Sequence, residues 1–315
     1  MMSRPLALSI LLALAAPAPP ANAYVLWGAS LTGDTHIFYI DVTAPLCALP
    51  PGVCGACTPG AVQDWVGATI LAAQAWSDPL VAGANFRYVF GGFIAPSPTP
   101  PDYPPNVNVV TLGQACIGYP GNLTAGPGFF HTCMFADIPF DVSGSPPSPG
   151  LCFDLQGSTV HQLGHALGLA HSLVPGASMF TQSVNALEWR DLHPDDIAGV
   201  QAIYGPLAPN TPVLDYAGVP FTGATITIRL LNAVGGSAIA FDTSPGPAFI
   251  PGIGQVHVGL TPNLFVITKV APNAFPMPIP PSPAIAGATY YMHALTFAPG
   301  VGLVASNPSR IHIPY

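Results

Sequence analysis

Charged side chains are scarce in this chain of 315 residues, because Asp, Glu, Lys and Arg together make up only 6% of it. It contains a single lysine, Lys269, and a single glutamate, Glu188. Fourteen acidic residues against six Lys and Arg give a formal charge of −8. Proteins that bind nucleic acid gather Lys and Arg against the phosphate backbone. The composition therefore excludes a basic nucleic-acid footprint, and no nucleic-acid partner is expected.

Uninterrupted apolar runs are also missing beyond the first 23 residues, so no membrane span is expected in the mature chain. Residues 1–23 have the three parts of a secretory signal: a positive start at Arg4, an apolar stretch over 6–16, and small residues at 21–23. The apolar stretch is shorter than the ~20 residues that cross a bilayer. We therefore predict cleavage after Ala23 and a secreted, extracellular or periplasmic protein. An uncleaved signal that anchors the chain is the alternative.

Proline and glycine are abundant, at 40 and 33 residues, and half of the chain is hydrophobic. This balance fits a loop-rich, β-rich secreted protein better than a disordered one. An even number of cysteines in an exported chain predicts up to three disulfides, whose pairing stays open. The six cysteines are Cys47, Cys54, Cys57, Cys116, Cys133 and Cys152. A redox or metal role for the Cys54–Cys57 pair is the less favoured alternative.

The first 205 residues combine strand-like and helix-like patterns. Apolar side chains recur at helical spacing across 61–77, and Gly168 and Gly205 are placed to end two further helices. The last of these begins at Pro194, whose missing N–H costs nothing in a first helical turn. The predicted strands are 35–42, 86–90, 108–112 and 129–140, and the predicted helices are 61–77, 154–168 and 194–204.

A proline-rich segment, 206–212, reads as a linker, and helical periodicity is absent after it. Short alternating segments separated by turn residues follow to the end of the sequence. They predict an antiparallel β-sandwich over 213–315, a fold that takes about 100 residues. The strand candidates are 224–230, 256–260, 264–270, 289–297 and 310–313.

Three histidines are arranged for metal binding. His161 and His165 lie one helical turn apart and so project from the same helix face. Gly168 lets the chain reverse, and His171 then supplies a third imidazole. Three neutral nitrogens leave the fourth tetrahedral position open, as in catalytic zinc sites. We therefore predict a Zn²⁺ site at these histidines. The alternative, that they are incidental, is disfavoured by the glycines and leucines in register between them.

Gln162 stands directly after the first of these histidines, where a zinc protease has a carboxylate. In such a site zinc lowers the pKa of a bound water to about 7, and the carboxylate passes its proton to the leaving amine. A carboxamide accepts a hydrogen bond but cannot hold that proton. We therefore expect Gln162 to spare the metal and to remove about 10²–10⁴-fold of acid–base help. Glu188 is not an evident substitute.

The segment 161–172 (HQLGHALGLAHS) resembles the core of matrixin-type metzincins, a group that includes matrix metalloproteinases and many secreted bacterial relatives. Met179 matches the methionine turn beneath the zinc in that family. Further similarity lies in 73–78, 136–138, 192–197 and 201–205. The resemblance covers about 24–205. It implies zinc peptidase chemistry on an extended peptide or protein substrate; calcium binding stays open, with no site located.

The resemblance implies an α+β fold: a metzincin catalytic domain with a twisted mixed sheet, an antiparallel edge strand near the substrate cleft at 136–138, and three helices. An all-β accessory domain follows, weakly similar to C-terminal sandwich modules of secreted bacterial proteins. The expected organisation is a signal peptide at 1–23, the peptidase domain at 24–205, a linker at 206–212 and the sandwich at 213–315.

Four interpretations of the function remain. The chain is a secreted zinc endopeptidase impaired by Gln162, or a pseudoprotease that binds peptide without cutting it. In the third interpretation, an active enzyme carries an engineered Glu→Gln change at position 162 that traps a complex. In the fourth interpretation the β-sandwich is an adhesin or surface-binding module and the metal domain is vestigial.

Overall fold

The computed structural model describes residues 35–42, 61–95, 107–112, 123–126, 129–134, 154–181, 187–233, 235–251, 253–269, 274–298, 300 and 302–314. The predicted signal peptide, the predicted edge strand at 136–138 and five of the six cysteines lie outside these residues. The cleavage site and the disulfides therefore stay predictions. Within the described ranges, no helix is long and apolar enough to cross a membrane.

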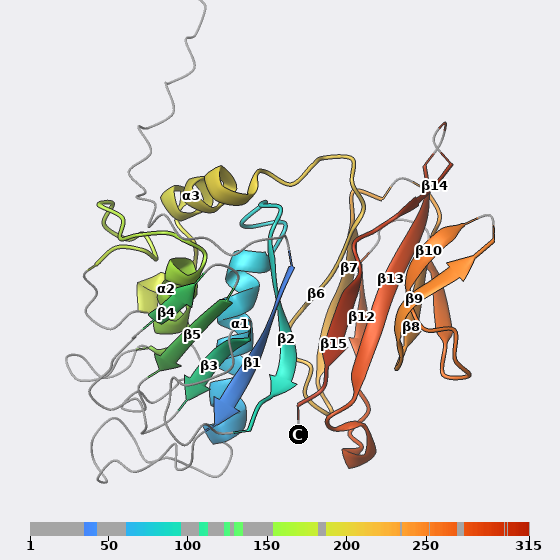
Figure 1. Ribbon diagram of the computed structural model, residues 1–315, viewed down its shortest axis with the longest axis horizontal. Coiled ribbons are helices and arrows are strands. Elements are labelled where there is room, and N and C mark those ends of the chain that lie inside the picture. Colours follow the sequence, from blue (N-terminus) through green and yellow to red (C-terminus); the bar gives the residue numbers. More distant parts are fainter. Residues whose placement is uncertain are drawn as a thin grey trace, which may run out of the picture.

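A five-stranded mixed sheet forms the first half of the described chain (Figure 1). Its order is β2 (Arg87–Phe93), β1 (Thr35–Val42), β3 (Asn108–Leu112), β5 (Phe129–Met134) and β4 (Leu123–Gly126). The pairs β1–β2, β1–β3 and β3–β5 are parallel, whereas β4 pairs antiparallel with β5 at the edge. The sequence predicts the four parallel strands but not β4, a segment of four residues with little β-branching.

Three helices accompany this sheet: α1 (Ala61–Ser77), α2 (Leu155–Ala166) and α3 (Pro194–Tyr204). The predicted bounds of α1 and α3 are confirmed. Helix α2 is shorter than predicted, because Asp154 is its N-cap and accepts a hydrogen bond from the Gly157 N–H at 2.6 Å. It ends before Gly168, whose φ of 99° is the left-handed conformation that reverses the chain. The mixed α+β fold is thus confirmed.

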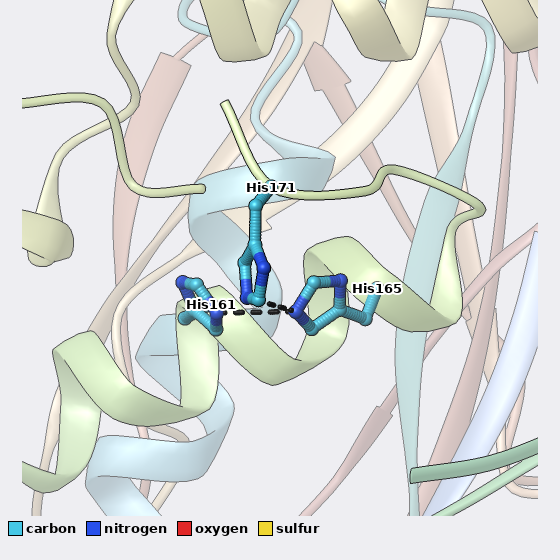
Figure 2. Close-up of side chains that lie close together, drawn as sticks. All are labelled: His161, His165 and His171. Carbon is cyan, nitrogen blue, oxygen red and sulfur yellow. Dashed lines mark hydrogen bonds between the residues drawn. The ribbon is translucent and has the colours of Figure 1, made fainter. Parts of the chain in front are cut away.

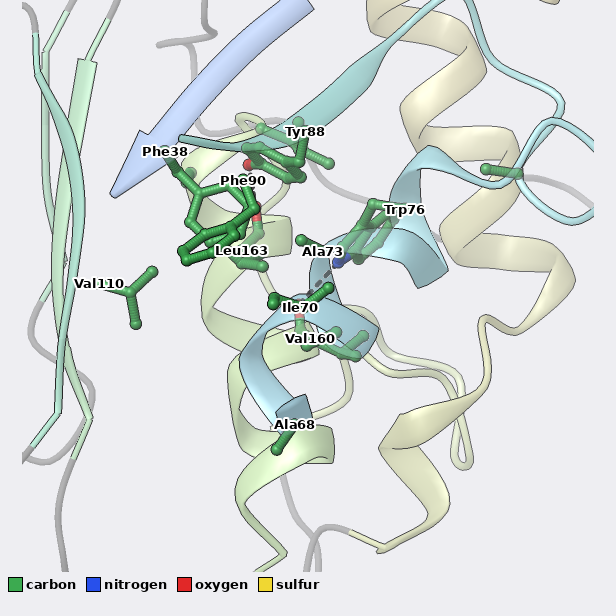
Figure 3. Close-up of a cluster of buried hydrophobic side chains, with 14 of the residues drawn as sticks. Phe38, Ala68, Ile70, Ala73, Trp76, Tyr88, Phe90, Val110, Val160 and Leu163 are labelled. Atoms are coloured by element: carbon green, nitrogen blue, oxygen red, sulfur yellow. Dashed lines mark hydrogen bonds between the residues drawn. The ribbon is translucent and has the colours of Figure 1, made fainter. Parts of the chain in front are cut away.

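Aromatic side chains in the core fix α2 against the sheet and α1 (Figure 3). The indole of Trp76, on α1, is fully buried and donates to the Val160 carbonyl at 2.8 Å. The Tyr88 hydroxyl, on β2, donates to the Leu163 carbonyl at 3.0 Å. Each large side chain buried in this way contributes about 1.5–3 kcal/mol. Helix α2 is therefore held in place from two sides.

The second half of the described chain is built of antiparallel strands. One sheet has the order β11 (Phe265–Lys269), β8 (Ser237–Asp242), β13 (Thr289–Ala298), with β14 (Gly302–Ala305) and β15 (Ser309–His312) both paired to β13. A second sheet has the order β12 (Ala274–Pro278), β7 (Thr225–Leu231), β6 (Val213–Ala217). A hairpin of β9 (Pro245–Ile250) and β10 (Gly254–Val258) and a 3₁₀ turn η3 (Pro283–Ile285) complete this half.

The two antiparallel sheets share one apolar core. Strand β7 alternates buried and less buried residues, so that one face of its sheet is apolar. The buried residues come from both sheets: Leu214, Tyr216, Ile226, Ile228, Leu230, Ile239, Phe241, Met292, Ala294 and Ile311. Five predicted strands correspond to β7, β10, β11, β13 and β15, and the other five were not predicted. Of these, β9 and β12 contain prolines, which argue against a strand in the sequence.

The two halves are in direct contact: β15 lies beside β2 (Figure 1), and the Arg87 side chain on β2 donates to the Leu214 carbonyl on β6 at 2.6 Å. The Gln74 side chain on α1 donates to the Gly218 carbonyl at 2.9 Å and accepts from its N–H at 3.2 Å. Arg229 on β7 pairs with Asp78, just after α1, at 3.0 Å. Phe221, between β6 and β7, packs against the first core. The predicted linker thus joins two parts that share an interface; the domain boundary itself stays a prediction.

Candidate metal centre

The three predicted ligand histidines come together at the C-terminal end of α2 (Figure 2). His161 and His165 project from one face of the helix, and His171 reaches the same point from the segment after Gly168. The Nε2 atom of His165 lies 3.1 Å from that of His161 and 3.2 Å from that of His171. Nitrogens around a tetrahedral zinc at 2.0–2.1 Å are about 3.3 Å apart. The geometry therefore fits a zinc ion bound through three Nε2 atoms.

Backbone carbonyls fix the tautomers of the two helix histidines. The Nδ1 of His161 lies 2.6 Å from the Ser178 oxygen, and the Nδ1 of His165 lies 2.7 Å from the Leu169 oxygen. A carbonyl oxygen only accepts, so Nδ1 carries the proton in each ring. The Nε2 atoms then present their lone pairs to the centre, as metal-ligating histidines do.

Both rings are also kept neutral. Burial lowers the pKa of His161 from 6.5 to about 3, and the neighbouring His165 acts in the same direction. Burial likewise lowers the pKa of His165, against the opposing effect of its hydrogen bond to Leu169. A neutral imidazole is the form that binds a metal ion. These two side chains are therefore ready to bind at neutral pH.

Met179 lies directly beneath α2 and is 2% exposed. It packs against Gly164, where a Cβ would collide with the methionine sulfur and lie 2.7 Å from Cζ2 of Trp76. Asp196, on α3, accepts hydrogen bonds from the N–H groups of Ser178 at 2.7 Å and Met179 at 3.1 Å. The family resemblance implied a methionine turn at Met179. The two hydrogen bonds to Asp196 connect this turn to α3. Helix α3 thereby holds the carbonyl that orients His161.

A short 3₁₀ turn, η2 (Leu187–Arg190), lies against the first histidine and was not predicted. The Trp189 indole stacks on the His161 ring with centroids 4.5 Å apart and planes at 23°. Arg190 forms a bidentate ion pair with Asp154, with an Nε–Oδ2 distance of 2.9 Å. No sequence motif links residues so far apart, and only the tertiary structure reveals this contact.

Gln162 follows His161 directly in the sequence and is half-buried. Its Oε1 atom is buried and has no hydrogen-bond partner among the residues that the structure describes. The carboxylates of Asp154, Asp195 and Asp196 are already engaged with Arg190, Ser172 and the Ser178 backbone. Glu188 belongs to η2, and the placement of its side chain is not described. The residue next to the first ligand is therefore an amide that can exchange hydrogen bonds but not accept a proton.

Comparison with known proteins identifies the segment that carries this centre. The family model described as Matrixin matches residues 137–205, which include α2, all three histidines and α3. Mouse matrix metalloproteinase-19 is 47% identical over 51 residues, covering 16% of this chain and 10% of that protein. Mouse matrilysin is 35% identical over 96 residues, covering 30% of this chain and 32% of that protein. Human neutrophil collagenase is 37% identical over 84 residues, covering 24% and 18%.

The chain thus spans about a third or less of the length of these relatives. Among solved structures, wild-type OgpA from Akkermansia muciniphila aligns with 90% of this chain and 94% of its own, at 11% identity. The TM-score of this alignment is 0.25.

Proposed function

We propose that this chain, which matches the Matrixin family model over residues 137–205, is a matrixin-type zinc metallopeptidase that binds one Zn²⁺ and acts on extended peptide or protein substrates with a hydrolytic step weakened by Gln162. The observation that carries the proposal is the convergence of three Nε2 atoms, from His161, His165 and His171, within 4.8 Å of one another. This triad is consistent with the zinc site of matrixins.

The chemistry of the donor set supports the choice of zinc. Three neutral imidazoles bind zinc and leave a fourth position open to solvent or substrate. When bound, zinc supplies Lewis acidity, which lowers the pKa of water in that position to about 7 and polarises a carbonyl group. The chain's own contribution is to hold His161 and His165 in the correct tautomer through Ser178 and Leu169.

Gln162 sets the limit on catalysis. A side chain at this position that takes up a proton and returns it to the leaving amine is worth about 10²–10⁴-fold in rate. That factor corresponds to about 3–5 kcal/mol of transition-state free energy. The amide of Gln162 hydrogen-bonds without titrating, so this part of the rate enhancement is lost while the histidines keep their metal.

The test compares the native chain with Gln162→Glu for zinc content and for hydrolysis of a mixed peptide library. We expect about one zinc per chain in both, and at least a hundredfold faster hydrolysis with glutamate. Gln162→Asn, which keeps the carboxamide, is the matched control and should not accelerate hydrolysis. Equal rates for the native chain and the Gln162→Glu variant would contradict the role given to this position. A purified chain without zinc, or a His165→Ala variant with unchanged zinc, would contradict the metal site.

A second candidate function is peptide binding without cleavage, which Gln162 favours, because a carboxamide stands where a zinc protease has its proton-accepting carboxylate. The native chain is then expected to retain peptides that mass spectrometry shows to be intact. Hydrolysis of the same peptides after Gln162→Glu would identify a disabled peptidase. Zinc-dependent binding that persists without any hydrolysis in the glutamate form would instead identify a binding module.

We also propose that the chain is exported, carries disulfides, and uses residues 213–315 as an accessory β-domain. The pattern of residues 1–23 and the even cysteine count support export. Mass spectrometry of the secreted, non-reduced protein tests both points. A mature chain that begins before residue 24, or six free thiols, would contradict them.

A further inference from the structure

The His161 ring is enclosed on several sides, and an indole covers one of its faces. His165 meets it edge-on, with centroids 4.7 Å apart at 90°, and His171 lies at 5.2 Å. Trp189 lies nearly parallel to it at 4.5 Å and is itself 8% exposed. We propose that Trp189 is a positioning residue of the metal centre, which holds the His161 imidazole in its ligand orientation and excludes water from that side. The proposal rests on the zinc site but not on peptidase activity.

The hydrogen bond of His161 leaves a degree of freedom that this contact removes. The bond from Nδ1 to the Ser178 carbonyl fixes the direction of one ring nitrogen. It does not fix the tilt of the ring about the Nδ1–oxygen line, and tilting moves Nε2 away from the centre. A flat indole against the ring face opposes this tilt. Stacked aromatic pairs of this kind are worth about 0.5–1.5 kcal/mol beyond their burial.

The turn that carries Trp189 is tied to the helix that carries His161. Arg190 pairs with Asp154, whose side chain is only 1% exposed. The same carboxylate caps the N-terminus of α2 through the Gly157 N–H. Breaking such a buried pair by removing one partner costs about 3–5 kcal/mol, so the turn and the helix are firmly joined. The indole therefore keeps a constant place relative to the ligand.

Among the residues that the structure describes, no hydrogen bond from the indole N–H helps to hold the Trp189 side chain in place. Its Nε1 is buried and has no partner among the described residues. Trp76, by contrast, satisfies its Nε1 at the Val160 carbonyl. An unpaired buried donor costs about 1–3 kcal/mol. The packing of the Trp189 indole faces offsets this cost. One of these faces lies nearly parallel to the His161 ring.

The experiment replaces Trp189 and observes the metal directly. Trp189→Phe keeps a flat ring, whereas Trp189→Leu keeps apolar bulk without one. Zinc affinity is measured by chelator competition, and ligand geometry by the visible absorption of the Co²⁺-loaded protein. We expect Leu to weaken zinc binding about 10–100-fold, as changes to the residues that orient metal ligands do, and to shift the Co²⁺ bands. We expect Phe to stay within a few-fold of the native chain, with bands close to native.

A core tryptophan provides the matched control. Trp65 lies on α1, is 3% exposed and belongs to the apolar core. Trp65→Phe should leave the Co²⁺ spectrum unchanged even if it lowers stability. Native zinc affinity and a native Co²⁺ spectrum in Trp189→Leu would overturn the proposal. If no protein, including the native chain, binds metal, the zinc site itself fails, which is a different result.

A fluorescence measurement keeps the test independent of the folding of the leucine variant. Co²⁺ quenches nearby indoles, and Trp189 lies against a ligand ring. Co²⁺ should therefore quench the native chain by a larger amount than Trp189→Phe, which lacks this indole. Equal absolute quenching in the two proteins would overturn the contact on which the proposal depends.

Discussion

Replacing Gly164 with alanine tests how tightly α2 must pack for the metal centre to form. Gly164 lies in the last turn of α2. Within a helix the change alone favours folding by up to about 1 kcal/mol, because alanine is the better helix former. The new Cβ would nevertheless lie 2.7 Å from Cζ2 of Trp76 and collide with the sulfur of Met179. Carbon atoms in contact normally stay about 3.5–4.0 Å apart. A shift approaching 1 Å is therefore needed at the tryptophan alone.

The two neighbours differ in their ability to make room. Methionine is flexible and adapts at low cost. Trp76 is fully buried, and its Nε1 is tied to the Val160 carbonyl at 2.8 Å, so its ring does not yield without breaking that bond. Overpacking of this kind costs about 1–3 kcal/mol. Against the helix-propensity gain, we expect Gly164→Ala to lower the free energy of unfolding by about 1–2 kcal/mol and to weaken zinc binding.

Gly67, in the middle of α1, provides the control. A Cβ there would meet Phe221 at 3.6 Å, which is ordinary contact. Gly67→Ala should therefore raise the free energy of unfolding by about 0.5–1 kcal/mol. Urea unfolding followed by circular dichroism, in chelator and with zinc, measures both variants. The packing argument is refuted if Gly164→Ala is as stable as Gly67→Ala and retains native zinc affinity.

Three further predictions concern charged or titrating groups. Asp196→Ala leaves three backbone N–H groups, those of Ser178, Met179 and His193, without their acceptor. We therefore expect about 2–4 kcal/mol lower stability and weaker zinc binding, both measured by calorimetry. Arg229→Met leaves two half-buried carboxylates, those of Asp215 and Asp78, without this ion-pair partner; a loss of about 1–3 kcal/mol in urea unfolding is expected, and no loss would contradict it. Burial, aided by the Arg310 charge, lowers the pKa of His312 in the folded chain. Because the unfolded chain then takes up the proton near pH 6.5, stability falls as the pH drops below that value; the decrease should be smaller in His312→Gln.

The metal centre illustrates what spacing in a sequence can predict. The helical repeat places His161 and His165 on one face, and a glycine with a left-handed φ returns His171 to it, so the ligand set needs no tertiary information. Helices α1 and α3 were also predicted with correct bounds, because apolar periodicity and the Pro194 start are local signals. The N-cap at Asp154 is likewise local, but it was missed in favour of a longer helix.

The remaining features depend on contacts between distant residues. Nothing local distinguishes Trp189 or Arg190, whose partners His161 and Asp154 lie 28 and 36 residues away in the chain. Strands β9 and β12 contain prolines. They form strands only because the neighbouring strands β10 and β7 pair with them through backbone hydrogen bonds. The interface between the two halves was not anticipated at all, because a proline-rich linker normally indicates separate parts.

That interface also determines when helix α1 completes its contacts during folding. Its link to Gly218 spans 144 residues of sequence, and the pair between Asp78 and Arg229 spans 151. Such non-local contacts slow folding, because the entropy of closing a long loop is lost before the contact stabilises anything. A ribosome must translate at least as far as Arg229 before α1 has all of its neighbours. Helix α1, the first helix in the described sequence, is thus among the last elements to complete its tertiary contacts.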